Sequence, residues 1–130
     1  MDTFGFTVET QKSVDAAAEA VGVALAERGF SVLWELDVND TLNKKGLSLG
    51  ARVRILEVCS APRAKRALET NPIVSYFLPC KVVAYERDGH TEIGLPRPST
   101  FMGMLGDARL NDLADEVERL LIEAVKAAAA

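Results

Sequence analysis

The chain has 130 residues, of which 48% are hydrophobic and 26% are charged, and its formal net charge at pH 7 is -4. This length suits one domain with its own core, so we expect residues 1–130 to form a single domain. The acidic balance argues against a nucleic-acid partner, because proteins that bind nucleic acids normally have a basic face. The sequence shows neither a long apolar run typical of a membrane span nor a secretory signal, so we expect no membrane partner and a cytoplasmic location.

The N-terminal part of the chain predicts a strand and then a long helix. Apolar and polar side chains alternate over residues 4–9, which is the period of a half-buried strand. Ser13 is a suitable N-cap for a helix that continues to about Arg28. Gly29 can adopt the left-handed conformation that often ends a helix.

Two further strands follow, with a short helix between them. Residues 30–38 alternate again, and they place Trp34 on the same apolar face as their first residues, so we expect Trp34 in the core. Residues 39–46 contain a capping side chain and a terminal glycine, which predict a short helix. Residues 52–59 then alternate as a third strand, with apolar positions on both faces.

The second half of the chain predicts a helix and a β-hairpin. Pro62 suits the first turn of a helix that runs to about Glu69, because the missing N–H of proline costs nothing there. Residues 80–86 and 91–95 have strand composition. The Asp-Gly pair within residues 87–90 accepts positive φ and therefore predicts a tight hairpin turn between them.

A loop and a long helix complete the chain. We expect residues 101–107, "FMGMLGD", to form a loop with the freedom of a lid, because it contains two glycines. Residues 107–126 carry an apolar stripe with helical spacing. We expect the terminal residues 127–130 to fray. Four acidic side chains of this helix are expected on its solvated face: Asp112, Asp115, Glu116 and Glu118.

These elements predict an α+β fold, a two-layer sandwich of a mainly antiparallel sheet with helices on one face. The predicted second and fourth strands carry apolar side chains on both faces, for example Leu33 in the second and the adjacent Val82 and Val83 in the fourth. Some of these side chains must therefore lie on the face away from the helices. Small domains of this kind commonly cover such a face in a dimer. We therefore expect a homodimer.

The segment from Val58 to Glu86 resembles the domain of unknown function 302 family. The resemblance lies in "VCSAP" at a strand end, a helix containing Ala64, "NPIVSYFLPC" and the strand "KVVAYE", and it extends over most of the chain. It implies a two-layer strand-helix-strands-helix fold related to the TATA-binding-protein-like fold, and dimerisation. The family often has one residue between this cysteine and the next proline, whereas two separate Cys59 from Pro62 here. The resemblance implies no activity.

The two cysteines are the first candidates for a functional site. Cys59 ends the third predicted strand and Cys80 begins the fourth, so antiparallel pairing would place both at one edge of the sheet. The N-terminus of the following helix, Arg63 and Lys81 would each favour a thiolate. The spacing is not that of a C-x-x-C motif, and the alternative is that each cysteine is a small buried apolar residue.

A metal centre would need more ligands than these two thiols. The single histidine, His90, lies in the predicted hairpin turn at the far end of the fourth strand, which excludes it from a site with Cys59 and Cys80. Met102 and Met104 offer thioether sulfur to a soft ion such as Cu(I), but methionines in such a segment also fill gaps in a core or a groove.

Three functions are compatible with these patterns. The first is a non-enzymatic, dimeric binding or accessory protein of unknown ligand, with a pocket near the cysteine edge and the "FMGMLG" segment. The second is a redox or soft-metal-binding protein using the two cysteines, and a soft metal ion is the only cofactor that the sequence suggests. The third is a structural partner subunit. The candidate site residues are Cys59, Cys80, Pro62, Pro79, Lys81, Met102 and Met104.

Overall fold

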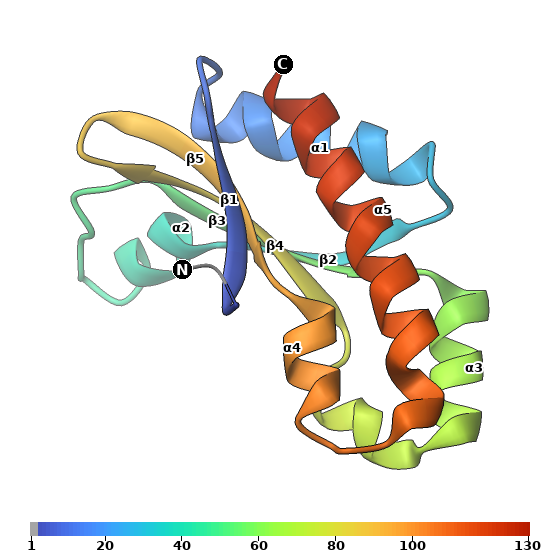
Figure 1. The fold of residues 1–130 in the computed structure, drawn as a ribbon. Coiled ribbons are helices and arrows are strands. Elements are labelled where there is room, and N and C mark those ends of the chain that lie inside the picture. Colours follow the sequence, from blue (N-terminus) through green and yellow to red (C-terminus); the bar gives the residue numbers. More distant parts are fainter. Residues whose placement is uncertain (1–2) are drawn as a thin grey trace.

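The computed structural model describes residues 3–130 and contains a five-stranded antiparallel sheet (Figure 1). The strands are Gly5–Thr10 (β1), Ser31–Asp37 (β2), Val53–Cys59 (β3), Cys80–Arg87 (β4) and His90–Pro96 (β5), in the spatial order β1-β5-β4-β3-β2. The helices are Val14–Ala26 (α1), Val38–Asn43 (α2), Ala61–Thr70 (α3), Pro98–Gly103 (α4) and Asn111–Ala129 (α5), with 3-10 turns at Pro72–Tyr76 (η1) and Ala108–Leu110 (η2). The predicted α+β sandwich with an antiparallel sheet is confirmed.

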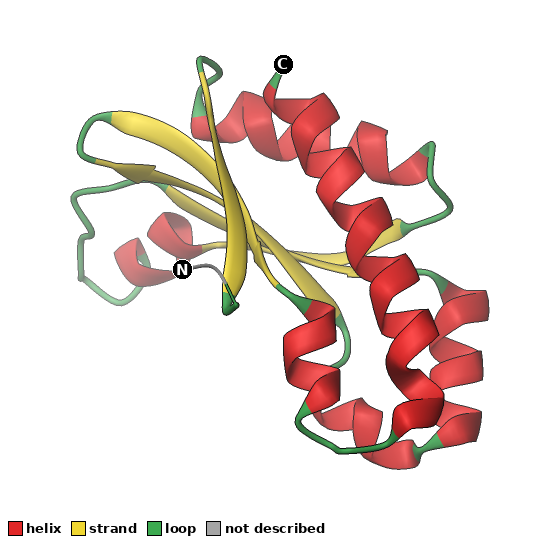
Figure 2. Ribbon diagram, in the orientation of Figure 1, coloured by secondary structure: helices red, strands yellow, loops and turns green. Residues whose placement is uncertain are grey.

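The hydrophobic core lies between the sheet and two long helices. Figures 1 and 2 show α1 and α5 lying across one side of the sheet. Side chains from both layers are completely buried there, among them Leu56, Val82 and Ile93 of the sheet and Leu25 and Leu121 of the helices. In the described part of the chain, no helix is long and apolar enough to cross a membrane.

The predicted start and stop signals are confirmed at several elements. The Ser13 side chain accepts a hydrogen bond from the Ala16 backbone N–H and caps α1, and Gly29 follows that helix with φ of 82°. Asp88 and Gly89 both have positive φ in the β4–β5 turn. This turn fixes the hairpin register, in which Arg87 is opposite His90.

The expectation that Trp34 lies in the core is wrong, and a β-bulge explains why. Val32 pairs with Val58 of β3, but Trp34 pairs with Glu57, so one extra residue of β2 is accommodated between them. An extra residue reverses the side-chain alternation beyond the bulge. Trp34 therefore points away from the helices and is 54% exposed, whereas Phe30, before the bulge, is buried.

The expected lid-like loop is partly helical. Residues 98–103 form α4, and Pro98 occupies its first turn, where its fixed φ suits a helix. The Ser99 backbone N–H and hydroxyl both donate to the Glu118 carboxylate of α5, at 2.9 and 2.5 Å. This contact fixes the start of α4. It also corrects the expectation that Glu118 belongs to the solvated face of the last helix.

The last helix is longer at its C-terminus than its sequence suggests. We expected residues 127–130 to fray, but α5 continues to Ala129. The Ala128 side chain is buried, and the Thr10 hydroxyl donates a 2.9 Å hydrogen bond to the Ala129 carbonyl. Tertiary packing against β1 therefore outweighs the usual fraying of a chain end.

Candidate functional site

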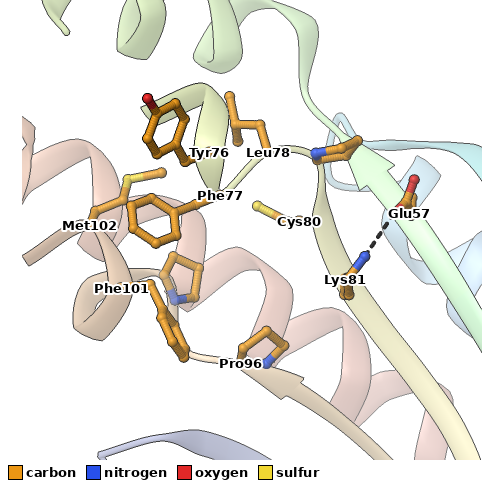
Figure 3. Close-up of a pocket in the computed structure, with 11 residues that line it drawn as sticks. Glu57, Tyr76, Phe77, Leu78, Cys80, Lys81, Pro96, Phe101 and Met102 are labelled. Atoms are coloured by element: carbon orange, nitrogen blue, oxygen red, sulfur yellow. Dashed lines mark hydrogen bonds and ion pairs between the residues drawn. The ribbon is translucent and has the colours of Figure 1, made fainter. Parts of the chain in front are cut away.

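A cavity of about 240 Å³ lies at the end of the sheet where β4 begins, between η1 and α4 (Figure 3). Its wall is mainly apolar and aromatic. The rings of Tyr76, Phe77 and Phe101 line it, together with three prolines, Leu78 and Met102. The polar groups that line it are the Cys80 thiol and an ion pair between Glu57 and Lys81.

One wall comes from the segment between α3 and β4. The Asn71 side chain accepts a hydrogen bond from the Ile73 backbone N–H, which starts η1, and donates one of 3.2 Å to Asp107 near the start of α5. Val74 is fully buried and anchors the turn. These contacts leave the next aromatic residue, Tyr76, 78% exposed at the edge of the cavity.

The opposite wall is the short helix α4. Its Met102 side chain is 5% exposed, and the Phe101 ring lies 6.2 Å from that of Phe77, with an angle of 45° between the ring planes. Phe4 packs edge-on against Phe101 at 5.7 Å between centroids. The Glu118 carboxylate holds this helix through Ser99 and also accepts a 2.9 Å hydrogen bond from the Arg97 guanidinium. The wall is thus positioned by both ring packing and a charged contact.

The charged groups at the cavity neutralise each other. Glu57 and Lys81 are cross-strand partners of β3 and β4, and the Lys81 ammonium donates to the Glu57 carboxylate at 2.7 Å. Both side chains lie on the sheet face that α1 and α5 do not cover, because Leu56 and Val82, their neighbours along the strands, face the core. Figure 3 shows this pair at one side of the cavity.

The thiol of Cys80 faces the cavity (Figure 3), but it is not activated. Burial raises the pKa of Cys80 to about 11, with a smaller electrostatic contribution from Cys59. The thiol is therefore protonated at neutral pH. The two cations expected to favour a thiolate are already paired, Arg63 with Glu116 and Lys81 with Glu57.

The structure does not form a two-cysteine centre. Strands β3 and β4 are antiparallel neighbours as expected, but Val58, not Cys59, is the cross-strand partner of Cys80. The two cysteines are not close, and both are free thiols. Within residues 3–130, no group of three or more His, Cys, Asp or Glu side chains could hold a metal ion. His90 is exposed in the hairpin turn at the other end of β4.

The structure divides the candidate site residues into two groups. Pro79, Cys80, Lys81 and Met102 all line the cavity, whereas Cys59, Pro62 and Met104 lie outside its lining. Met104 is 72% exposed. The sequence reasoning missed the partner of Lys81, the aromatic walls and two of the prolines: Glu57, Tyr76, Phe77, Phe101, Pro96 and Pro98. The adjacent aromatic residues Tyr76 and Phe77 within "SYFLPC" were the sequence feature that could have indicated an aromatic wall next to Cys80.

Comparisons with known proteins agree with this fold. The model of the family described as "Domain of unknown function DUF302" matches residues 6–128. A crystal structure of an uncharacterized conserved DUF302 protein from Bacillus stearothermophilus is 37% identical to this chain and superimposes with a TM-score of 0.92. The similarity covers 96% of this chain and 98% of that one. None of the curated proteins matches. The chain belongs to the DUF302 family.

Proposed function

We propose that this protein is a dimeric, non-catalytic binding protein whose small-molecule ligand occupies the cavity between η1, α4 and the start of β4. The observation that supports this proposal is the cavity's composition. A concave, largely apolar wall with a few convergent polar groups is typical of small-molecule sites. Its volume of about 240 Å³ is somewhat below the range of roughly 300–1,000 Å³ for drug-sized ligands, so the ligand is small.

The titratable groups of the cavity favour binding over catalysis. A general acid or base needs a pKa near the working pH, and a nucleophilic cysteine needs a lowered one. Burial shifts the pKa of Cys80 in the opposite direction, to about 11. The carboxylate of Glu57 and the ammonium of Lys81 are engaged with each other.

Binding at this site can be tested by NMR. We expect members of a library of small fragments to shift the backbone amide signals of the non-proline residues within 76–81 and 96–102. A variant that fills the cavity, Met102→Trp, should lose those shifts while a fragment bound elsewhere should keep them. Fragments that bind only outside these segments would refute the proposed site.

The proposed dimer uses the sheet face opposite α1 and α5. This face carries apolar side chains that are only partly buried in the single chain, including Leu36, Ile55, Val83 and Tyr85, and the exposed Trp34. Pairing two such faces would remove this apolar surface from water. The face includes Glu57 and Lys81, so the second copy would lie beside the cavity.

Light scattering tests the assembly. We expect the mass of a dimer at micromolar concentration for the unaltered chain and that of a monomer for Val83→Lys. The matched control is Val23→Lys, because Val23 lies on α1 and is already 61% exposed. A monomer's mass for the unaltered chain would refute the dimer and leave the cavity proposal untouched.

A further inference from the structure

We infer that the ligand is an uncharged, flat aromatic molecule of one or two fused rings with one polar group at its edge. This inference rests on the proposed function, because it assigns a ligand class to the same cavity. Size, ring geometry and charge each restrict that class.

The volume sets the number of rings. An apolar cavity of about 150 Å³ inside a protein is sufficient for one benzene molecule. The cavity here, at about 240 Å³, is larger by more than half. It therefore has room for a two-ring molecule such as indole.

The walls favour a flat aromatic body. The Phe77 and Phe101 rings are inclined at 45° with centroids 6.2 Å apart, an arrangement to which a third ring can add by offset or edge-to-face contact. In Figure 3 the sulfur atoms of Met102 and Cys80 are drawn on either side of the Phe77 ring. Thioether and thiol sulfur both make favourable contacts with aromatic rings. Tyr76, at the exposed edge, adds a further ring next to the opening.

The charge balance favours uncharged ligands over ionised ones. The cavity's cation and anion, Lys81 and Glu57, are 2.7 Å apart and neutralise each other, and the Cys80 thiol is protonated. A charged ligand group near this pair would meet both charges, so attraction to one is largely offset by repulsion from the other. Away from the pair it would lie unpaired among apolar side chains, which is unfavourable. A neutral N–H or O–H group can instead donate to Glu57 while the ion pair stays intact.

Three probes that share one ring system separate these possibilities. Indole is neutral, indole-3-carboxylate is an anion and tryptamine is a cation at pH 7. In NMR titrations we expect indole to shift the backbone amide signals of the non-proline residues within 76–81 and 96–102. The two charged probes should bind roughly tenfold more weakly or worse. The variant Phe101→Ala should weaken indole binding.

A change of the ion pair gives a second readout. In Glu57→Gln, the Lys81 ammonium loses its partner, so we expect indole-3-carboxylate to bind at least about tenfold more tightly than to the unaltered protein, with little change for indole. A charged probe that bound the unaltered cavity as tightly as indole would overturn this inference and leave the proposed function intact. If neither these probes nor any fragment shifted the cavity amides, the proposed function itself would be wrong.

Discussion

The contact between Glu118 and the start of α4 can be tested by removing one charge. The Glu118 carboxylate accepts hydrogen bonds from the Ser99 backbone N–H, the Ser99 hydroxyl and the Arg97 guanidinium, at 2.9, 2.5 and 2.9 Å. In Glu118→Gln, the amide oxygen can still accept from Ser99. Its NH₂ group would then face the Arg97 donor, so the charged hydrogen bond is lost.

The expected cost follows from this one lost bond. A hydrogen bond to a charged group contributes about 1.5–3 kcal/mol. The Glu118 and Arg97 side chains are 15% and 23% exposed, so solvent screens part of the interaction, and we expect a loss of about 1–2 kcal/mol in the free energy of unfolding. For a domain of this size that corresponds to a decrease of roughly 4–8 °C in Tm.

The pH dependence makes the test specific. Burial alone would raise the pKa of Glu118, but the hydrogen bonds from Ser99 and the Arg97 cation outweigh it and lower the pKa. A lowered carboxyl pKa contributes stability above the ordinary value of 4.5, and this contribution is lost as the pH falls through the folded-state pKa. The stability difference between the unaltered protein and Glu118→Gln should therefore shrink in acid.

Urea unfolding followed by circular dichroism, at neutral and at acidic pH, measures this difference. The matched control is Asp115→Asn, an exposed position on the same helix, which should leave the unfolding midpoint unchanged. An unchanged midpoint for Glu118→Gln at neutral pH, or a loss that persists at the lowest pH, would refute the assigned role of this carboxylate.

Two further predictions concern Cys80 and the C-terminus. In Cys59→Ser, which leaves Cys80 as the only thiol, alkylation by iodoacetamide at pH 8 should be slow and should accelerate roughly 100-fold in urea, because burial raises the pKa of Cys80 from 9.0 to about 11. The stability that this group contributes is complete below pH 9 and is lost as the pH rises towards 11. Equal alkylation rates with and without urea would contradict this prediction. Removing residues 127–130 should cost about 1–2 kcal/mol by thermal unfolding, because it deletes the buried Ala128 methyl group and the Thr10 hydrogen bond, whereas removal of Ala130 alone should cost far less.

The fold was predictable because local signals agreed with the packing. Ser13, Gly29 and the Asp88-Gly89 turn determine where elements begin and end, and each acts through its own side chain or backbone. The Trp34 expectation was wrong for a different reason. A bulge adds one residue to a strand without any glycine or proline to mark it, so the alternation of β2 read from the sequence has the correct period but the wrong phase after Val32.

The acidic side chains of α5 show the same limit. Helical spacing places Glu118 on a polar face, and it does lie beside the apolar stripe rather than within it. Its role depends on α4, because Ser99 in the first turn of that helix donates to the Glu118 carboxylate. Spacing along one helix contains no information about a second element that covers it.

The meeting of the two aromatic walls of the cavity was predictable from the sequence, and the β4–β5 hairpin explains why. A two-residue turn at Asp88-Gly89 pairs Arg87 with His90, and the same register runs on to Val83 opposite Gly94. Continued by two residues, it sets Lys81 opposite Pro96, which brings the segment before β4 next to the segment after β5. The aromatic residues of those two segments must then meet, whatever their order in the sequence.

The position of Glu57 beside Lys81 was not predictable in this way, because no short turn connects β3 and β4. The segment between β3 and β4 contains α3 and η1, so the register that places Glu57 beside Lys81 is set by the packing of Leu56 and Val82 against the helices rather than by a local signal. A shift of this register by one residue would turn Leu56 out of the core and separate the ion pair at the same time. The charge neutrality that restricts the ligand is therefore maintained by the same core contacts that hold β3 and β4 together.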